Sequence, residues 1–279
     1  MSKPVRIGVV APGTRIDPEL ASRVQALASE RFAAPAPQIH FHPQCFLSWG
    51  HFAGDDAARA EAFLDIANDA SFDALWFARG GYGSCRIASA VLPKLSRAAR
   101  AKIYLGYSDA GSLLAGLYRA GFPGVAHGPM PVDITRDGGE VAVGRALAYL
   151  AGRDPASLEP SLSSGLPAVA FNIMILGALL GTALEPDLSN HVLLLEEVSE
   201  QMYRIDRSLF HITSLPSIRR VAGIRLGRCN QIIPNQPEFG QTEEQVVRHW
   251  CAASGIPYLG RADIGHDIHN KVVPFGRRG

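Results

Sequence analysis

The chain has 279 residues, is 47% hydrophobic, and carries 27 basic and 26 acidic residues, for a formal net charge of +1. This length and hydrophobic content are enough for a large buried core, in one large domain or two modest ones. The balanced charge gives no indication of nucleic acid or a membrane surface as a partner. The four scattered cysteines predict a reducing compartment and argue against a structural zinc site.

The first half of the chain predicts alternating strands and helices. Three short apolar runs each end at a Pro-Gly or glycine turn and are typical of buried strands: residues 5–11, 74–78 and 103–105. Three segments have helical character: residues 56–70, 110–120 and 141–150. Short apolar strands separated by helices favour a parallel sheet that is buried on both faces. We therefore predict the α/β class, with a parallel-sheet domain over residues 1–151.

The second half predicts a smaller domain. Residues 152–166 are rich in Ser, Pro and Gly, a composition typical of a linker. Strands are expected at 192–195 and 221–226, with fewer helices and more turns than in the first half. We predict a β-rich C-terminal domain over residues 167–279.

One uncharged stretch, residues 160–184, is long enough for a membrane helix, which needs about 20 apolar residues. It contains Pro167, Asn172 and three glycines, and no basic cluster flanks it. These features favour a buried strand or helix in a soluble core. The N-terminal apolar run is too short for the core of a secretion signal.

Ser108 is the first candidate for chemistry, because it follows an apolar strand and precedes a helical segment. At such a turn a serine is exposed, and the N–H groups of the next helix can hold an oxyanion. Gly106 permits the tight turn. The sequence differs from the G-x-S-x-G pattern of α/β hydrolases. The alternative interpretation is that Ser108 or Asp109 caps the following helix.

A glycine-rich turn, Ala-Arg-Gly-Gly-Tyr-Gly-Ser-Cys-Arg, follows another strand at residues 78–86. Such a turn can cradle a phosphate, but the Lys-Ser/Thr ending of a P-loop and the G-x-G-x-x-G spacing are both missing. It can also lend a backbone N–H to an oxyanion hole, or be only a tight turn.

Glu196 and Glu197 follow directly on the predicted strand at residues 192–195. A carboxylate in that position can orient a histidine, as the third member of a catalytic triad does. The alternative is a solvated strand end followed by an acidic helix start.

Two histidines are candidates for the base. His266 lies in a polar loop near the C-terminus, where it can act as a general base. The neighbouring Asp263, Asp267 and His269 leave a metal site as an alternative. His127 is a rival base, whose alternative interpretation is a buried, hydrogen-bonded histidine at a turn.

Taken together, these segments resemble the LD-carboxypeptidase family, the murein tetrapeptide carboxypeptidases and their microcin-immunity relatives. The resemblance runs from about residue 5 to residue 276 and rests on segments in the family's order: 7–12, 78–86, 106–109, 127–129, 195–200, 203–207, 221–227 and 265–266. Several motifs that agree in order are far more specific than any one of them.

The resemblance implies a catalytic triad of Ser108, Glu196 and His266. Glu196 matches the acidic member better than Glu197, whose position in relatives is usually Asp. The resemblance also implies an oxyanion hole formed by the backbone amides of Asp109 and Gly81. It implies no metal, no cofactor and, in many members, a homodimer.

The fold that the resemblance implies is an N-terminal α/β domain and a C-terminal β-rich domain with the active site between them. The implied reaction is hydrolysis of the L,D-peptide bond between diaminopimelate and the terminal D-alanine of a murein tetrapeptide, during cytoplasmic cell-wall recycling. One alternative is a self-immunity peptidase that cleaves peptidyl or aminoacyl nucleotides. The other is a non-catalytic muropeptide-binding protein.

Three further residues are candidate substrate contacts: Arg86, Asn172 and Tyr203. Arg86 and Tyr203 can bind a substrate carboxylate or tie the domains together, whereas a structural role is expected for Arg207. The chain departs from the family in having Ala-Phe-Asn at residues 170–172, where relatives carry Gly-Gly-Asn or a similar turn. Glu197 in place of Asp and the somewhat short chain are further departures.

Overall fold

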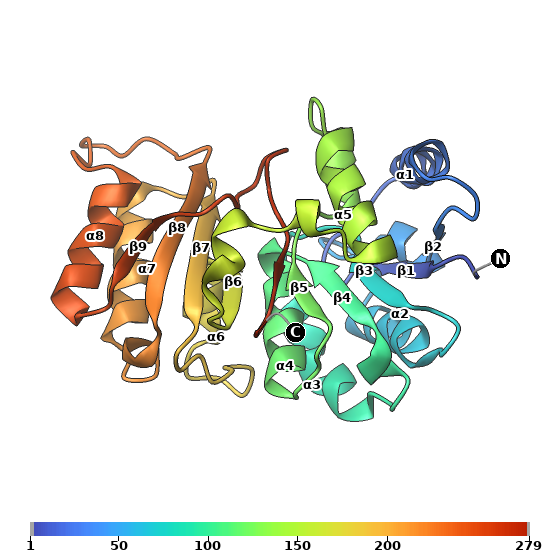
Figure 1. Cartoon of the computed structure of the whole chain (residues 1–279), viewed down its shortest axis with the longest axis horizontal. Helices are drawn as coiled ribbons and strands as arrows, with labels where there is room; N and C mark the ends of the chain where they lie inside the picture. Colours follow the sequence, from blue (N-terminus) through green and yellow to red (C-terminus); the bar gives the residue numbers. More distant parts are fainter. Residues whose placement is uncertain (1–2, 278–279) are drawn as a thin grey trace.

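Two β-sheets lie side by side along the longest axis of the molecule (Figure 1). The computed structural model describes residues 3–277, with backbone only for residues 163 and 164. Within this range the first sheet has the strand order β10-β5-β4-β3-β1-β2 and the second has the order β6-β7-β8-β9. The strands are β1 Arg6–Val10, β2 Gln38–Phe41, β3 Ala74–Phe77, β4 Ile103–Gly106, β5 Val125–His127, β6 Ala168–Asn172, β7 Val192–Val198, β8 Gly223–Asn230, β9 Tyr258–Arg261 and β10 Val273–Pro274.

Helices cover both faces of the first sheet. Its strands β1 to β5 are parallel, and β3 and β4 are buried along their whole length, as the uninterrupted apolar runs predicted. Helices α1 and α5 pack on one face, and α2, α3 and α4 pack on the other (Figure 1). The helices are α1 Pro18–Arg31, α2 Asp56–Asn68, α3 Ser84–Val91, α4 Gly111–Arg119, α5 Glu140–Gly152, α6 Ile173–Leu179, α7 Met202–Ser214 and α8 Glu243–Ser254. The predicted α/β class is confirmed.

The second sheet is smaller, and its four strands are also parallel, a direction that the sequence analysis did not specify. Leu193 and Leu195 on one face of β7 pack in the same core as α6, α7 and α8. Leu194 on the other face packs in one cluster with Ile264 and Val273. These two residues belong to the C-terminal segment, residues 262–277, which follows β9.

The uncharged stretch at residues 160–184 forms β6 and the short helix α6, and Asn172 stands between them. All five residues of β6 are buried. In the described part of the chain, we find no helix with the length and apolar character that crossing a membrane requires.

The C-terminal segment joins the two sheets. Strand β10 pairs antiparallel with β5 of the first sheet, and two residues later Gly276 exchanges two backbone hydrogen bonds with Ala168 of β6. Residues 152–166, predicted as a linker, form two 3-10 turns, and Leu158 forms a bridge with Val272 of the same C-terminal segment. The apolar core also runs through both halves, from Leu114 of α4 to Leu193 of β7.

Candidate active site

Ser108 stands at the carboxyl end of β4, where the loops that follow the parallel strands of the first sheet gather. It begins a 3-10 turn, Ser108–Ala110, that leads directly into α4. Its φ of +59° lies in the left-handed region, which a residue with a Cβ rarely adopts. A strained serine in a sharp strand-to-helix turn presents its hydroxyl above the sheet edge, and such strain is characteristic of functional sites.

The glycine-rich turn after β3 packs directly against Ser108. A Cβ atom built on Gly80 would lie 2.7 Å from the Ser108 Oγ, so only glycine fits there. The Asp109 carboxylate fastens the same turn, because it accepts a hydrogen bond of 2.9 Å from the backbone N–H of Ser84, the first residue of α3. Burial raises the pKa of Asp109. Neither Ser108 nor Asp109 caps α4 with its side chain, so the helix-cap interpretation is wrong for that helix.

Glu196 and His266 form a buried pair in the second half of the chain. The His266 Nδ1 lies 2.6 Å from the Glu196 Oε2, and the side chains are 9% and 0% exposed. Because a carboxylate only accepts, the proton of this hydrogen bond belongs to Nδ1, which leaves the Nε2 lone pair of a neutral His266 available as a base. Burial lowers the pKa of His266, but the charge and hydrogen bond of Glu196 outweigh burial and raise it overall.

Tyr107 brings the two halves of the site together. The centroid of its ring lies 4.6 Å from the ring centroid of His266 and 5.5 Å from that of His127. Its hydroxyl donates a hydrogen bond of 2.8 Å to the buried Asp133. Since Tyr107 immediately precedes Ser108, this contact places the serine turn of the first sheet beside the Glu196–His266 pair of the second.

The loop that carries His266 is fixed by β8. The backbone N–H of His266 donates to the Asn230 side-chain oxygen at 2.8 Å. Arg228 binds Asp263 at 2.6 Å and also forms two hydrogen bonds with Asp267. These two carboxylates, considered above as metal ligands, are thus held by a guanidinium. In the described residues no group of three or more His, Cys, Asp or Glu side chains is placed to hold a metal ion.

His127 is buried at the end of β5 and supports the same loop. Its Nε2 lies 3.1 Å from the side-chain oxygen of Asn270, and that oxygen also accepts from the Gly265 backbone N–H. Burial lowers the pKa of His127 to about 4. His127 is therefore a neutral histidine that positions the His266 loop. This agrees with the alternative interpretation of His127 as a buried, hydrogen-bonded histidine.

Two protein-family models match the chain, one in each half. The model of the LD-carboxypeptidase N-terminal domain matches residues 7–128, and the model of the C-terminal domain matches residues 167–279. The chain belongs to the LD-carboxypeptidase family. It is therefore a serine carboxypeptidase, and the resemblance stated from the sequence is confirmed.

Curated relatives agree with this assignment. A Synechocystis sp. protein whose name places it among the carboxypeptidases is 31% identical over 82% of this chain and 76% of its own length. The murein tetrapeptide carboxypeptidase of Pseudomonas aeruginosa is 25% identical over 98% of this chain and 91% of its own length.

Solved structures share the fold. The muramoyltetrapeptide carboxypeptidase of Oxalobacter formigenes gives a TM-score of 0.77 at 18% identity, with 96% of this chain and 93% of that chain covered. The microcin C7 self-immunity protein in complex with aspartyl sulfamoyl adenosine gives a TM-score of 0.76 at 17% identity, with 99% and 92% covered. At these identities the likeness establishes the fold alone.

Glu197, the next residue of β7, has different partners from Glu196. Its carboxylate accepts hydrogen bonds from the Asn172 side chain at 2.6 Å and from the Met174 backbone N–H at 3.0 Å. Burial raises the pKa of Glu197 to about 7. Asn172 in turn accepts from the Ile175 backbone N–H and caps α6, so both polar atoms of its side chain are used inside the protein.

The other two proposed substrate contacts have protein partners of their own. Arg86 forms a two-pronged ion pair with Asp56, at 2.8 to 3.0 Å. The ring of Tyr203, in the first turn of α7, is 39% exposed and lies 5.3 Å from the guanidinium of Arg207.

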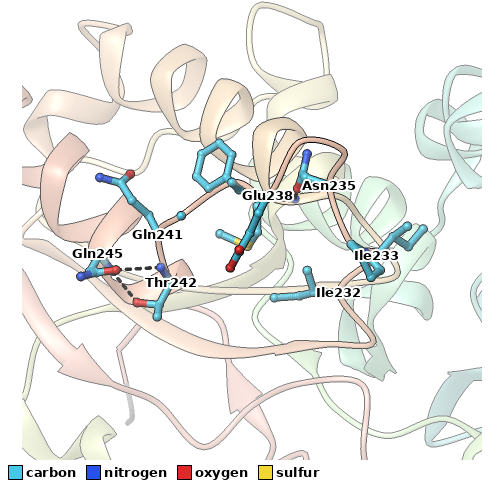
Figure 2. A pocket seen from close by; sticks show the side chains of 11 residues that line it. Ile232, Ile233, Asn235, Glu238, Gln241, Thr242 and Gln245 are labelled. Atoms are coloured by element: carbon cyan, nitrogen blue, oxygen red, sulfur yellow. Dashed lines mark hydrogen bonds between the residues drawn. The ribbon is translucent and has the colours of Figure 1, made fainter.

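A cavity of about 500 Å³ lies under the loop between β8 and α8 (Figure 2). The loop begins next to Asn230, but Ser108, Glu196 and His266 do not line the cavity. Thr242 and Gln245 hydrogen-bond to each other, and Asn235 accepts from the Met202 backbone N–H. Asn235 thus binds the first residue of α7, and Thr242 and Gln245 form the N-terminal cap of α8.

Proposed function

We propose that the chain hydrolyses the L,D-peptide bond between diaminopimelate and the terminal D-alanine of murein tetrapeptides, with Ser108 as nucleophile. The observation that carries the proposal is the buried 2.6 Å pair of Glu196 and His266, which lies beside the strained serine turn. The relative from Pseudomonas aeruginosa, a murein tetrapeptide carboxypeptidase, supports the choice of substrate.

In the first half of the reaction, the Nε2 of His266 takes the hydroxyl proton of Ser108 while the Oγ attacks the carbonyl carbon of diaminopimelate. Glu196 remains ionised, holds the proton on Nδ1 and stabilises the imidazolium that forms. The backbone N–H groups of Asp109 and Gly81 are proposed to bind the oxyanion. Gly81 has a φ of +102°, so a side chain there would be strained.

In the second half, the C–N bond breaks and His266 donates its proton to the departing D-alanine amine. Water then attacks the acyl-enzyme ester, with His266 as base again, and releases the tripeptide and free Ser108. No step requires a metal or a cofactor.

Mass spectrometry of a murein tetrapeptide incubated with the enzyme tests the proposal. We expect loss of the terminal D-alanine and no other cleavage, whereas an otherwise identical peptide ending in L-alanine should stay intact. The Ser108→Ala variant should release D-alanine at least about a thousandfold more slowly. An intact tetrapeptide together with cleavage of an aminoacyl nucleotide would overturn the substrate assignment in favour of the self-immunity activity.

A further inference from the structure

Four aromatic side chains gather at the surface beside the glycine-rich turn: Trp49, His51, Phe52 and Tyr82. We call this cluster the aromatic platform. The Trp49 and Tyr82 side chains are 54% and 49% exposed. Aromatic side chains that are exposed next to one another, rather than singly, are typical of binding surfaces.

The aromatic platform is preformed. Trp49 and Phe52 exchange two backbone hydrogen bonds of 2.9 and 3.0 Å across a tight turn, in which Gly50 has a φ of +55°. Their rings stack with centroids 6.1 Å apart and planes at 29°. The ring of Tyr82 lies 6.1 Å from that of Phe52. On Phe52 rests the guanidinium of the buried Arg59, at 4.6 Å.

The aromatic platform and Ser108 lie at the same edge of the first sheet, because their loops follow the carboxyl ends of parallel strands. Tyr82 comes two residues after Gly80, the glycine that packs on the Ser108 Oγ. Two residues span at most about 7 Å. On the other side, the His51 ring contacts Thr14 Oγ1 at 3.4 Å, and Thr14 packs against Gly81.

We propose that the aromatic platform is a subsite for the sugar ring of a sugar-bearing muropeptide whose stem peptide is cleaved at Ser108. This inference rests on the proposed function and extends it to the form of the substrate. The three stem residues between the scissile carbonyl and the sugar span about 10 Å when extended. A stem of that length reaches from Ser108 past Gly80 to Tyr82 and the rings beyond it.

The shape of the aromatic platform favours a sugar over a nucleobase. The planes of the Trp49 and Phe52 rings are inclined by 29° and those of the Phe52 and Tyr82 rings by 46°, so these rings form an open surface rather than a flat slot. A pyranose packs its C–H face on one such ring and keeps its hydroxyls toward water and polar tips, here His51 and the Tyr82 hydroxyl. Both arginines near Phe52, Arg59 and Arg86, are paired with Asp56.

The test compares kcat/KM for the free tetrapeptide and for the same tetrapeptide attached to N-acetylmuramic acid. In the wild type the sugar-bearing form should be the better substrate. Trp49→Ala should lower the ratio of the two kcat/KM values about tenfold, the loss expected for one aromatic stacking contact, and Trp49→Phe should restore most of it. Phe210→Ala, which removes a 51% exposed ring from α7, should leave the ratio unchanged. An equal ratio in wild type and Trp49→Ala would overturn the inference.

A binding measurement separates this inference from the proposed function. Muramyl dipeptide carries the sugar but lacks the scissile bond, so its calorimetric titration does not depend on catalysis. We expect Trp49→Ala to weaken its binding about tenfold relative to wild type. Binding that depends on Trp49 without D-alanine release would refute the proposed function but retain the aromatic platform as a sugar site. If D-alanine is released but the binding of muramyl dipeptide does not depend on Trp49, the proposed function is retained and the aromatic platform is refuted as a sugar site.

Discussion

At the scale of single residues, the pairing of His266 with Glu196 determines how the reaction should depend on pH. In the proposed mechanism His266 must be neutral to accept the Ser108 proton, and its pKa is raised above the ordinary value of 6.5. Activity should therefore be lost on acidification at a higher pH than an isolated imidazole would give.

Glu196→Gln should shift this acid limb to lower pH. Without the carboxylate charge, burial becomes the dominant influence and lowers the His266 pKa. The maximum kcat should also fall by about four orders of magnitude, because the glutamine no longer enforces the productive tautomer. Profiles of kcat and of kcat/KM between pH 5 and pH 9 measure both effects. Glu200→Gln, which changes a carboxylate paired with Arg204 just past the same strand, is the control; an unshifted limb in Glu196→Gln would refute the assigned role.

The sequence pointed to Ser108, Glu196 and His266 because each follows a strand end or a glycine, and the family resemblance connected them. It gave no sign that Tyr107 and Asn230 contact His266. These contacts join residues that are 36 or more positions apart in the chain, and a side chain's partner at that separation depends on the folded loops. Arg86 shows the same limit, since its pairing with Asp56 depends on how α2 and α3 pack.

At the scale of elements, the glycine-rich turn and the serine turn act as one unit, and Gly80 is the point of contact. Gly80→Ala would place a methyl group 2.7 Å from the Ser108 Oγ, and the serine would have to move. We expect kcat/KM to fall about a hundredfold, since displacements of about 1 Å cost that much in catalysis. Gly152→Ala, at a glycine with open space around it, is the matched control and should retain wild-type activity. Normal activity in Gly80→Ala would show that the turn does not position Ser108.

Three strands of the first sheet, β1, β3 and β4, could be predicted because they are short apolar runs that end at glycine or proline turns, whereas β2 and β5 were not predicted. Strand β10 could not, because it has only two residues, one of them proline, and exists through its pairing with β5. The cluster at the tight turn between Trp49 and Phe52 was not predicted for a similar reason, because the Phe52 ring meets Tyr82 of another loop only in the folded chain.

At the scale of the whole molecule, the proposed triad combines a serine from the first sheet with a glutamate and a histidine from the region of the second. The C-terminal segment and the shared core hold the two sheets in a fixed position relative to each other. Phe275 lies in that segment, 5% exposed, with its ring 5.2 Å from Phe171 of β6 and 5.5 Å from Tyr118 of α4.

Phe275→Ala should therefore lower the free energy of unfolding by about 3 kcal/mol, the typical cost of removing a buried phenylalanine ring. Urea denaturation followed by circular dichroism measures the change. The exposed Phe210→Ala should cost less than about 1 kcal/mol. Equal stabilities for the two variants would mean that the C-terminal segment does not hold the sheets together.

Labelling with a fluorophosphonate probe tests whether Ser108 is a nucleophile that His266, from the other half of the molecule, activates. Peptide mass spectrometry then locates the adduct. We predict a single adduct on Ser108 in the wild type, none in Ser108→Ala, and labelling at least about a hundredfold slower in His266→Ala. Labelling of another serine would refute Ser108 as the nucleophile, and an equal rate of labelling in His266→Ala would refute His266 as its base.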